Sequence, residues 1–251
     1  PISYKTEEGR NNSMVTIPNL AESTIIKSLS DALNTIENKR TREREYMLDY
    51  YEGMNIDGYV KEFFGTETLN QVPIFSQNLT RRICKVRSMT YKRPPKVSVD
   101  SRYLDYIDVE DLNSSRRQLE QITFLLGTMA LRSRWSEKEQ KIKYDLLSFF
   151  DPLFLAGEKE PVGIMYAIEN RGNSKIEKPW YAVWTEDRPG IPGTHFLIDQ
   201  NGEKKSVNEG DINPYGIVPV VYTHRYKPVR DWWSEGALDV VRADLSVSVA
   251  T

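Results

Sequence analysis

The chain has 251 residues, with 34 Lys or Arg against 36 Asp or Glu, so its formal net charge is only −2. Hydrophobic residues make up 39% and charged residues 28%, a composition typical of a folded globular protein and not of a disordered one. No run of eighteen apolar residues and no apolar signal-peptide segment occurs, so we expect no membrane association and no secretion signal. The single cysteine, Cys84, excludes an internal disulfide and fits a reducing compartment.

The first part of the chain is predicted to be a polar lead followed by one long helix. Residues 1–20 are expected to form a flexible lead. A helical pattern begins near Glu22, with apolar residues three or four positions apart, and it continues to Gly53, a favourable C-terminal stop. Residues 52–77 contain three Gly and one Pro and are predicted to form a loop.

The most unusual feature is a basic segment, since no Asp or Glu occurs from position 68 to position 99. Seven cations fall within sixteen positions: Arg81, Arg82, Lys85, Arg87, Lys92, Arg93 and Lys96. Asn78 is a good N-cap, and the helix that it begins must end before Pro94. Its inward stripe is predicted to be Leu79, Ile83, Val86 and Met89. The cations would then cover its outward face.

Five carboxylates follow the basic segment. They are Asp100, Asp105, Asp108, Glu110 and Asp111. A helix predicted over residues 109–134 begins among them, so acids that complement a helix dipole are the plainest interpretation. The basic helix can contact nucleic-acid phosphates, for which charge is enough, or it can pair with these acids within the chain or between subunits. Both interpretations stay open at this stage.

The spacing of apolar residues changes within the second half of the chain, from a helical to a strand-like pattern. The predicted helix over residues 109–134 has a regular buried face, and Gly127 interrupts it. That face consists of Leu112, Leu119, Ile122, Leu125, Leu126 and Met129. Short apolar or aromatic runs separated by turn residues then predict an antiparallel meander, with a hairpin at Asn201-Gly202. The last residues return to a helical pattern, with Leu238, Val241 and Leu245 on one face.

Few residues suggest catalytic chemistry, and we expect no catalytic residue, no metal site and no cofactor. Both histidines stand alone in predicted strands, and no phosphate-binding loop or nucleophile elbow occurs. Cys84 is predicted to be a buried thiol. Four tryptophans are candidate core or interface anchors, with base stacking as the alternative: Trp180, Trp184, Trp232 and Trp233. Trp180 and Trp184 are expected on one face of one strand.

Four short motifs occur in a recognisable order. An early helix ends in Y-Y-E-G at residues 50–53, and the helix that opens with Asn78-Leu79 runs into Pro94-Pro95. The stretch N-P-Y-G-I-V-P-V-V at 213–221 then leads to G-A-L at 236–238 and a helical pattern. This order resembles the N-terminal, wing part of portal proteins, the head–tail connectors of tailed bacteriophages.

The resemblance implies a structural virion protein and not an enzyme. Portal proteins form a ring, normally of twelve subunits, at one capsid vertex, and double-stranded DNA passes through it during packaging and ejection. The implied partners are further copies of the chain, major capsid and scaffolding proteins, the terminase large subunit, head–tail adaptor or tail proteins, and double-stranded DNA that passes through without sequence preference. Assembly would take place in the host cytoplasm.

The fold class expected is α+β, with four successive parts. They are a flexible lead over residues 1–20, a helical part of the wing over 21–143, an antiparallel β part over 144–233, and the start of a helix toward the stem over 234–251. The stem, clip and crown would lie outside the chain, which we expect to be a fragment because it begins with Pro1 and stops within a helical pattern. In a ring, the basic segment of one subunit can meet the acidic segment of the next, or it can face the packaged DNA.

Two other functions remain as hypotheses. The first is a module that binds nucleic acid through the basic helix. The second is a metal-dependent phosphodiesterase that would use Asp105, Asp108 and Asp111, although these carboxylates have no histidine near them in the sequence.

Overall fold

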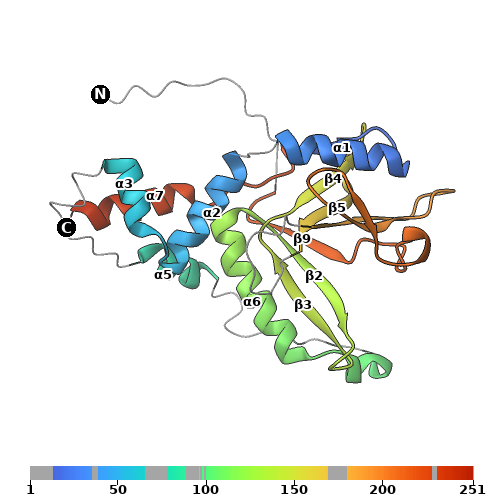
Figure 1. The fold of residues 1–251 in the computed structure, drawn as a ribbon. Coiled ribbons are helices and arrows are strands. Elements are labelled where there is room, and N and C mark those ends of the chain that lie inside the picture. The colour runs from blue at the N-terminus through green and yellow to red at the C-terminus, as the bar shows by residue number, and fades with distance from the viewer. Residues whose placement is uncertain are drawn as a thin grey trace. The chain divides into compact units, whose positions relative to one another are not determined.

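The computed structural model describes residues 14–35, 39–65, 78–88, 96, 98, 100–168, 180–227 and 231–250 (Figure 1). Its fold is mixed α+β, as the sequence predicted. The chain forms two compact units, each built from two separate stretches. Unit 1 consists of Pro1–Arg40 and Asp151–Ile212, and unit 2 consists of Thr41–Phe150 and Asn213–Thr251. The boundaries of these units are not the predicted ones at residues 143 and 233, because the first helix and the strands after residue 150 belong to the same unit.

Unit 1 is a six-stranded sheet with one long helix. In spatial order the strands are β1 (Val15–Ile17), β4 (Asp151–Leu155), β5 (Pro161–Ala167), β6 (Tyr181–Thr185), β7 (His195–Ile198) and β8 (Lys204–Ser206). β1 pairs with β4 in parallel, and every other pair is antiparallel. Helix α1 (Glu22–Thr35) buries Ile25 and Leu29 in the same core as Leu153 and Phe196. A one-turn helix, η3 (Glu209–Asp211), follows the sheet.

Two predictions for unit 1 have different outcomes. The antiparallel meander is confirmed for β4 to β8, and so is the hairpin at Asn201-Gly202, which joins β7 to β8. It is wrong for the first and last predicted runs, which form β3 (Lys141–Leu147) and β9 (Val220–His224) and pair with β2 (Thr128–Ser136) in a separate sheet. The flexible lead is wrong for its last residues, because Val15 and Ile17 are buried and form β1. Three residues are too few for alternation to stand out in a sequence.

Unit 2 combines helices with a three-stranded antiparallel sheet. The helices are α2 (Lys39–Glu52, whose first two residues belong to unit 1), α3 (Ile56–Phe64), α5 (Leu79–Arg87), η2 (Ser101–Tyr106), α6 (Val109–Leu126) and α7 (Leu238–Ala250). The sheet has the order β3 (Lys141–Leu147), β2 (Thr128–Ser136) and β9 (Val220–His224). Its core contains Tyr50 and Cys84 together with Leu125 from α6 and Val241 from α7. The final helix and its apolar face are therefore confirmed.

Three predicted boundaries in the helical part are wrong. The long first helix is two helices, α1 and α2. The loop predicted over residues 52–77 contains α3. The helix predicted to reach residue 134 ends at Leu126, because Gly127 adopts φ 84° and its N–H donates to the Thr123 carbonyl. The rest of that prediction forms β2, where Met129 is buried in a strand.

The predicted buried face of α6 is confirmed for all five of its helical members. They are Leu112, Leu119, Ile122, Leu125 and Leu126. Within the described residues, no helix is long and apolar enough to cross a membrane.

Candidate functional site

The first four cations of the basic segment lie on α5, and side chains and backbone of two other helices hold the start of this helix. Asn78 is its N-cap, as predicted: its side-chain oxygen accepts from the Arg81 N–H at 3.0 Å. Its amide nitrogen donates to the carbonyl of Tyr51 at 3.0 Å. Asp244 of α7 adds a second cap, because its Oδ2 accepts from the N–H of Thr80 at 2.7 Å and from its hydroxyl at 2.9 Å. The start of α5 is therefore held by α2 and α7.

These anchors give α5 a different inward face from the predicted one. The buried residues are Thr80, Cys84 and Ser88, spaced four apart. Ile83 is 38% exposed and Val86 is 64% exposed. The apolar stripe was predicted wrongly because a threonine whose hydroxyl is hydrogen-bonded to a buried carboxylate is as easily buried as an isoleucine. Met89 lies outside the described residues.

The cations of α5 are exposed, as predicted. Arg81, Arg82, Lys85 and Arg87 all face solvent, and Lys96 is exposed as well. Arg81 also places its guanidinium 5.6 Å from the centre of the Tyr51 ring, a cation–π contact. Lys92 and Arg93 lie outside the described residues. The outward surface of α5 is thus cationic and carries two exposed aliphatic side chains.

Cys84 has the buried position predicted for it. It is fully buried in the core of unit 2. Burial raises the pKa of its thiol to about 11, although the nearby Arg225 acts in the opposite direction. A thiol that stays protonated at neutral pH is a packing group and not a nucleophile.

A pocket of about 430 Å³ adjoins the end of α5. Its lining comes from three elements of unit 2, namely the end of α5, α6 from Arg116 onward and β9 with the residues after it. The lining residues are Arg87, Ser88, Arg116, Leu119, Glu120, Thr123, Phe124, Thr223, His224 and Arg225. Three of them are arginines and one is a glutamate, so the pocket is cationic on balance and has apolar walls. We call it the arginine pocket.

The interior of the arginine pocket is ordered by a few contacts. The guanidinium of Arg225 stacks 4.1 Å from the centre of the Phe124 ring. The hydroxyls of Thr123 and Thr223 are 2.9 Å apart and hydrogen-bonded. Within the described part of the chain, Arg225 Nε and Glu120 Oε2 are buried and have no hydrogen-bond partner. Unsatisfied buried polar groups of this kind favour a ligand that would complete them.

The acidic segment is spread around η2 and the start of α6. Asp100 caps η2 and holds Arg102 in an ion pair at 2.8 Å, which lowers the pKa of Asp100. Asp108 caps α6, accepting at 3.1 Å from the N–H groups of Glu110 and Asp111. The Asp111 N–H is the main reason for its lowered pKa, and Lys141 adds to this effect. Asp108 is therefore the N-cap of α6, and Glu110 and Asp111 lie in its first turn, where acids complement the helix dipole as expected.

The acidic cluster does not form a metal centre in the structure. Among the described residues, no group of three or more His, Cys, Asp or Glu side chains is placed to hold a metal ion. Asp105 lies on η2, whose six residues are all exposed. The structure therefore does not bring Asp105, Asp108 and Asp111 together as ligands.

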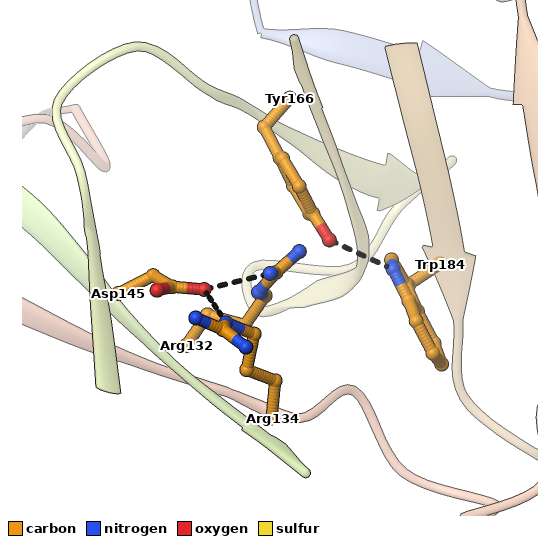
Figure 2. A network of polar contacts seen from close by, with 5 residues as sticks. All are labelled: Arg132, Arg134, Asp145, Tyr166 and Trp184. Atoms are coloured by element: carbon orange, nitrogen blue, oxygen red, sulfur yellow. Dashed lines mark hydrogen bonds and ion pairs between the residues drawn. The ribbon is translucent and has the colours of Figure 1, made fainter. Parts of the chain in front are cut away.

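The tryptophans of unit 1 have unequal roles. Trp184 is nearly buried in β6, where it stacks on His195 with ring centres 3.4 Å apart. Figure 2 shows its indole nitrogen pointing to the hydroxyl of Tyr166, at 3.1 Å. Trp180 lies just before β6 and is only half-buried, with Lys205 6.0 Å from its ring centre. Trp184 is a core anchor, whereas Trp180 lies beyond the start of β6 and is partly exposed.

The tryptophans of unit 2 belong to an aromatic cluster around a buried arginine. Trp232 and Trp233 are half-buried and pack edge-to-face, with ring centres 4.9 Å apart, and both contact Phe150. Arg44 is nearly buried beside Trp233 and donates to the carbonyls of Ser148 at 2.8 Å and of Thr128 at 2.9 Å. The pair therefore packs within the aromatic cluster of unit 2, which agrees with a role as core anchors.

Ion pairs fix the hairpin of β2 and β3. Figure 2 shows Arg132 and Arg134 converging on Asp145, at 2.7 and 2.8 Å. Arg132 and Asp145 are directly opposite each other in the antiparallel register, so the pair supports that register. These partly exposed pairs are structural.

The sequence missed Asp244, Arg44 and the residues of the arginine pocket. Asp244 had a signal, since it interrupts an otherwise apolar face of the last helix. The pocket had none, because its arginines come from three elements that are far apart in the chain. In comparisons with known proteins, no family profile matches this chain and no curated protein is similar to it.

Proposed function

We propose that this chain is the wing part of a portal-type protein, which forms a ring at a capsid vertex through which double-stranded DNA is packaged and ejected. In this role the chain is structural and performs no catalysis. It would dock a terminase and head–tail adaptor proteins, and it would let the duplex pass without holding it.

The observation that carries the proposal is that the first two resembling motifs contact each other, and that the helix beginning at the last motif contacts the helix of the second. Asn78, which opens the second motif, donates to the carbonyl of Tyr51 in the first. Thr80, two residues further, is capped by Asp244 of the helix that follows the last motif. Motifs at distant positions of the sequence thus form one joint in unit 2. If the motifs resemble those of portal proteins because the fold is the same, we expect them to contact one another in the core without forming an active site.

The glycine of the last motif is part of the same joint. The N–H of Ala237 donates to the carbonyl of Leu125 at 2.7 Å. A Cβ on Gly236 would lie 2.5 Å from that carbonyl oxygen and 3.1 Å from Met47 Cε. Only glycine lets the chain cross the end of α6 this closely.

The third motif forms the turn that leads into β9. Asn213 is nearly buried, and its side chain accepts from the Tyr215 N–H at 3.0 Å and donates to the Ile217 carbonyl at 2.9 Å. Gly216 adopts φ 66°, a conformation that favours glycine. The described residues of these motifs therefore have structural roles, whereas Pro94 and Pro95 lie outside the described residues.

The second candidate is a nucleic-acid-binding module, and the exposed cations of α5 favour it. Four positive charges on nine residues suit phosphate contacts. However, exposed Ile83 and Val86 share this surface. Aliphatic groups add nothing to a phosphate contact, whereas they are common in protein interfaces. The surface therefore fits a protein partner better.

The experiment is to determine the mass and symmetry of the assembled protein. Mass photometry and electron-microscope class averages should give a closed ring with a central hole, near twelve subunits. Titration with duplex DNA at several salt concentrations separates the second candidate. A monomer that binds duplex with a steep salt dependence would contradict the portal proposal and favour the binding module.

A further inference from the structure

We propose that the arginine pocket and the adjoining side of α5 receive the η2 segment of a second copy of this chain. The inference rests on the proposed ring, and it names the two surfaces that would form one contact of that ring. Both surfaces belong to unit 2.

The receiving surface combines charge with apolar area. On a helix, residues four apart lie on one side, so exposed Ile83 lies beside Arg87, which lines the arginine pocket. Val86 extends this apolar rim. Inside the pocket, Leu119 and Phe124 form apolar walls between the guanidinium groups. A volume of about 430 Å³ is within the range of pockets that enclose a small ligand, roughly 300–1,000 Å³, and so can enclose a few inserted side chains.

The inserted segment has the complementary properties. All six residues of η2 are exposed, including Tyr103 at 52%, Leu104 at 50% and Tyr106 at 45%. Asp105 lies among them. Residues 100–111 together carry five carboxylates and one arginine. Three large apolar groups exposed together are unusual for a surface that faces only water, and tyrosine is enriched where proteins bind each other.

The arrangement within unit 2 favours a second copy over the chain's own segment. η2 precedes the start of α6, whereas the pocket lies against Arg116–Phe124 in the middle and later turns of that helix. The seven residues from Val109 to Arg116 correspond to about 10 Å along the helix axis. Figure 1 shows α5 beside the upper part of α6, away from its start. Two different patches that bind each other make a head-to-tail contact, which closes into a ring when the rotation allows it.

The pocket chemistry also decides between an acidic protein segment and a phosphate backbone. A guanidinium binds carboxylates and phosphates equally well, so charge alone does not choose. The apolar walls and the rim of Ile83 and Val86 favour a protein segment, because a phosphodiester has no apolar group that could pack against them. An aromatic and acidic segment satisfies both parts of the surface.

The test is a charge exchange between the two surfaces. Arg87→Glu alters the pocket, and Asp105→Arg alters η2. Each variant alone should weaken self-association by about tenfold or more, equal to about 1.4 kcal/mol. An equimolar mixture of the two should assemble again when the variants alternate around the ring. Each altered pocket then meets an altered η2 of opposite charge, and each original pocket meets an original η2. The double variant should also assemble.

A matched control comes from the same helix. Lys85→Glu makes the same charge change two residues away, on the opposite side of α5 from Arg87 and outside the pocket lining. It should change self-association by less than about twofold, since it would lie outside the contact. All three substituted positions are exposed, so circular dichroism and melting temperature should stay unchanged.

The outcomes are distinguishable. If the original chain forms rings and both single variants form them equally well, the inference is overturned and the portal proposal survives. The same holds if the mixture fails to recover, or if Arg87→Glu loses duplex-DNA binding while it assembles normally. If the original chain stays monomeric at all concentrations, the proposed ring and this contact both fail.

Discussion

Asp244→Ala is the substitution for which the structure gives the most definite expectation. Asp244 is nearly buried, and its Oδ2 accepts from both the N–H and the hydroxyl of Thr80, which is fully buried. Removal of the carboxylate leaves two buried donors without that acceptor and removes the tie between α7 and α5.

The magnitude follows from these two hydrogen bonds. A hydrogen bond to a charged group contributes about 1.5–3 kcal/mol, and an abandoned buried donor costs about 1–3 kcal/mol. Because the two donors belong to one residue, we expect a total loss of about 3–4 kcal/mol in the free energy of unfolding. The melting temperature should then fall by about 10 °C. Asp244→Asn keeps an accepting oxygen and should lose only about 1–2 kcal/mol.

The assay is urea unfolding followed by fluorescence and by far-ultraviolet circular dichroism. Asp239→Ala is the matched control, because Asp239 is an exposed acid in the first turn of the same helix. It should cost about 0.5 kcal/mol or less. If Asp244→Ala is no more harmful than Asp239→Ala, the joint between α7 and α5 does not stabilise the unit and the reasoning is refuted.

Three further predictions concern other buried groups of unit 2. Gly236→Ala should cost about 3 kcal/mol in urea unfolding, because its Cβ would lie 2.5 Å from the Leu125 carbonyl oxygen. Gly53→Ala is the control, because a Cβ there meets open space although the backbone has φ 80°, and it should cost only about 1 kcal/mol. If the two variants cost the same, the close approach at Gly236 does not matter for stability. The Cys84 thiol, with its pKa raised to about 11, should resist a thiol reagent at pH 8 until the protein unfolds. An exposed thiol has a pKa of about 8.5, so the contribution of this thiol to the free energy of unfolding is complete below that pH and is lost as the pH rises toward 11. Fast labelling of the folded protein would contradict this prediction. Arg44→Met should cost about 3 kcal/mol, because backbone carbonyls lose a buried donor, and a melting temperature equal to the original would refute that role.

Periodicity predicted those parts of the fold in which one face of an element meets the core. The buried face of α6 and the antiparallel strands after residue 143 are of this kind. Gly127 was seen as an interruption, but a helix end and a kink look alike in a sequence. The deciding contact is a close approach of residues 234–236, in which a Cβ on Gly127 would lie 2.0 Å from the Ser234 carbonyl oxygen.

The candidate site was predicted only in part, for a physical reason. Exposed cations on α5 follow from charge, because a charge is rarely buried without a partner. The direction of Ile83 and Val86 does not follow, because Asp244 lies 164 positions after Thr80 and decides which side of α5 is buried. The arginine pocket depends in the same way on contacts between distant segments. Local rules cannot supply such contacts.

The most direct test of the proposed function is the mass and symmetry of the assembled protein. A portal-type ring predicts one dominant species in mass photometry, near twelve times the mass of one subunit, and class averages with a central hole wide enough for a DNA duplex. A protein that stays monomeric or dimeric at high concentration, with no ring in the class averages, would contradict the proposal.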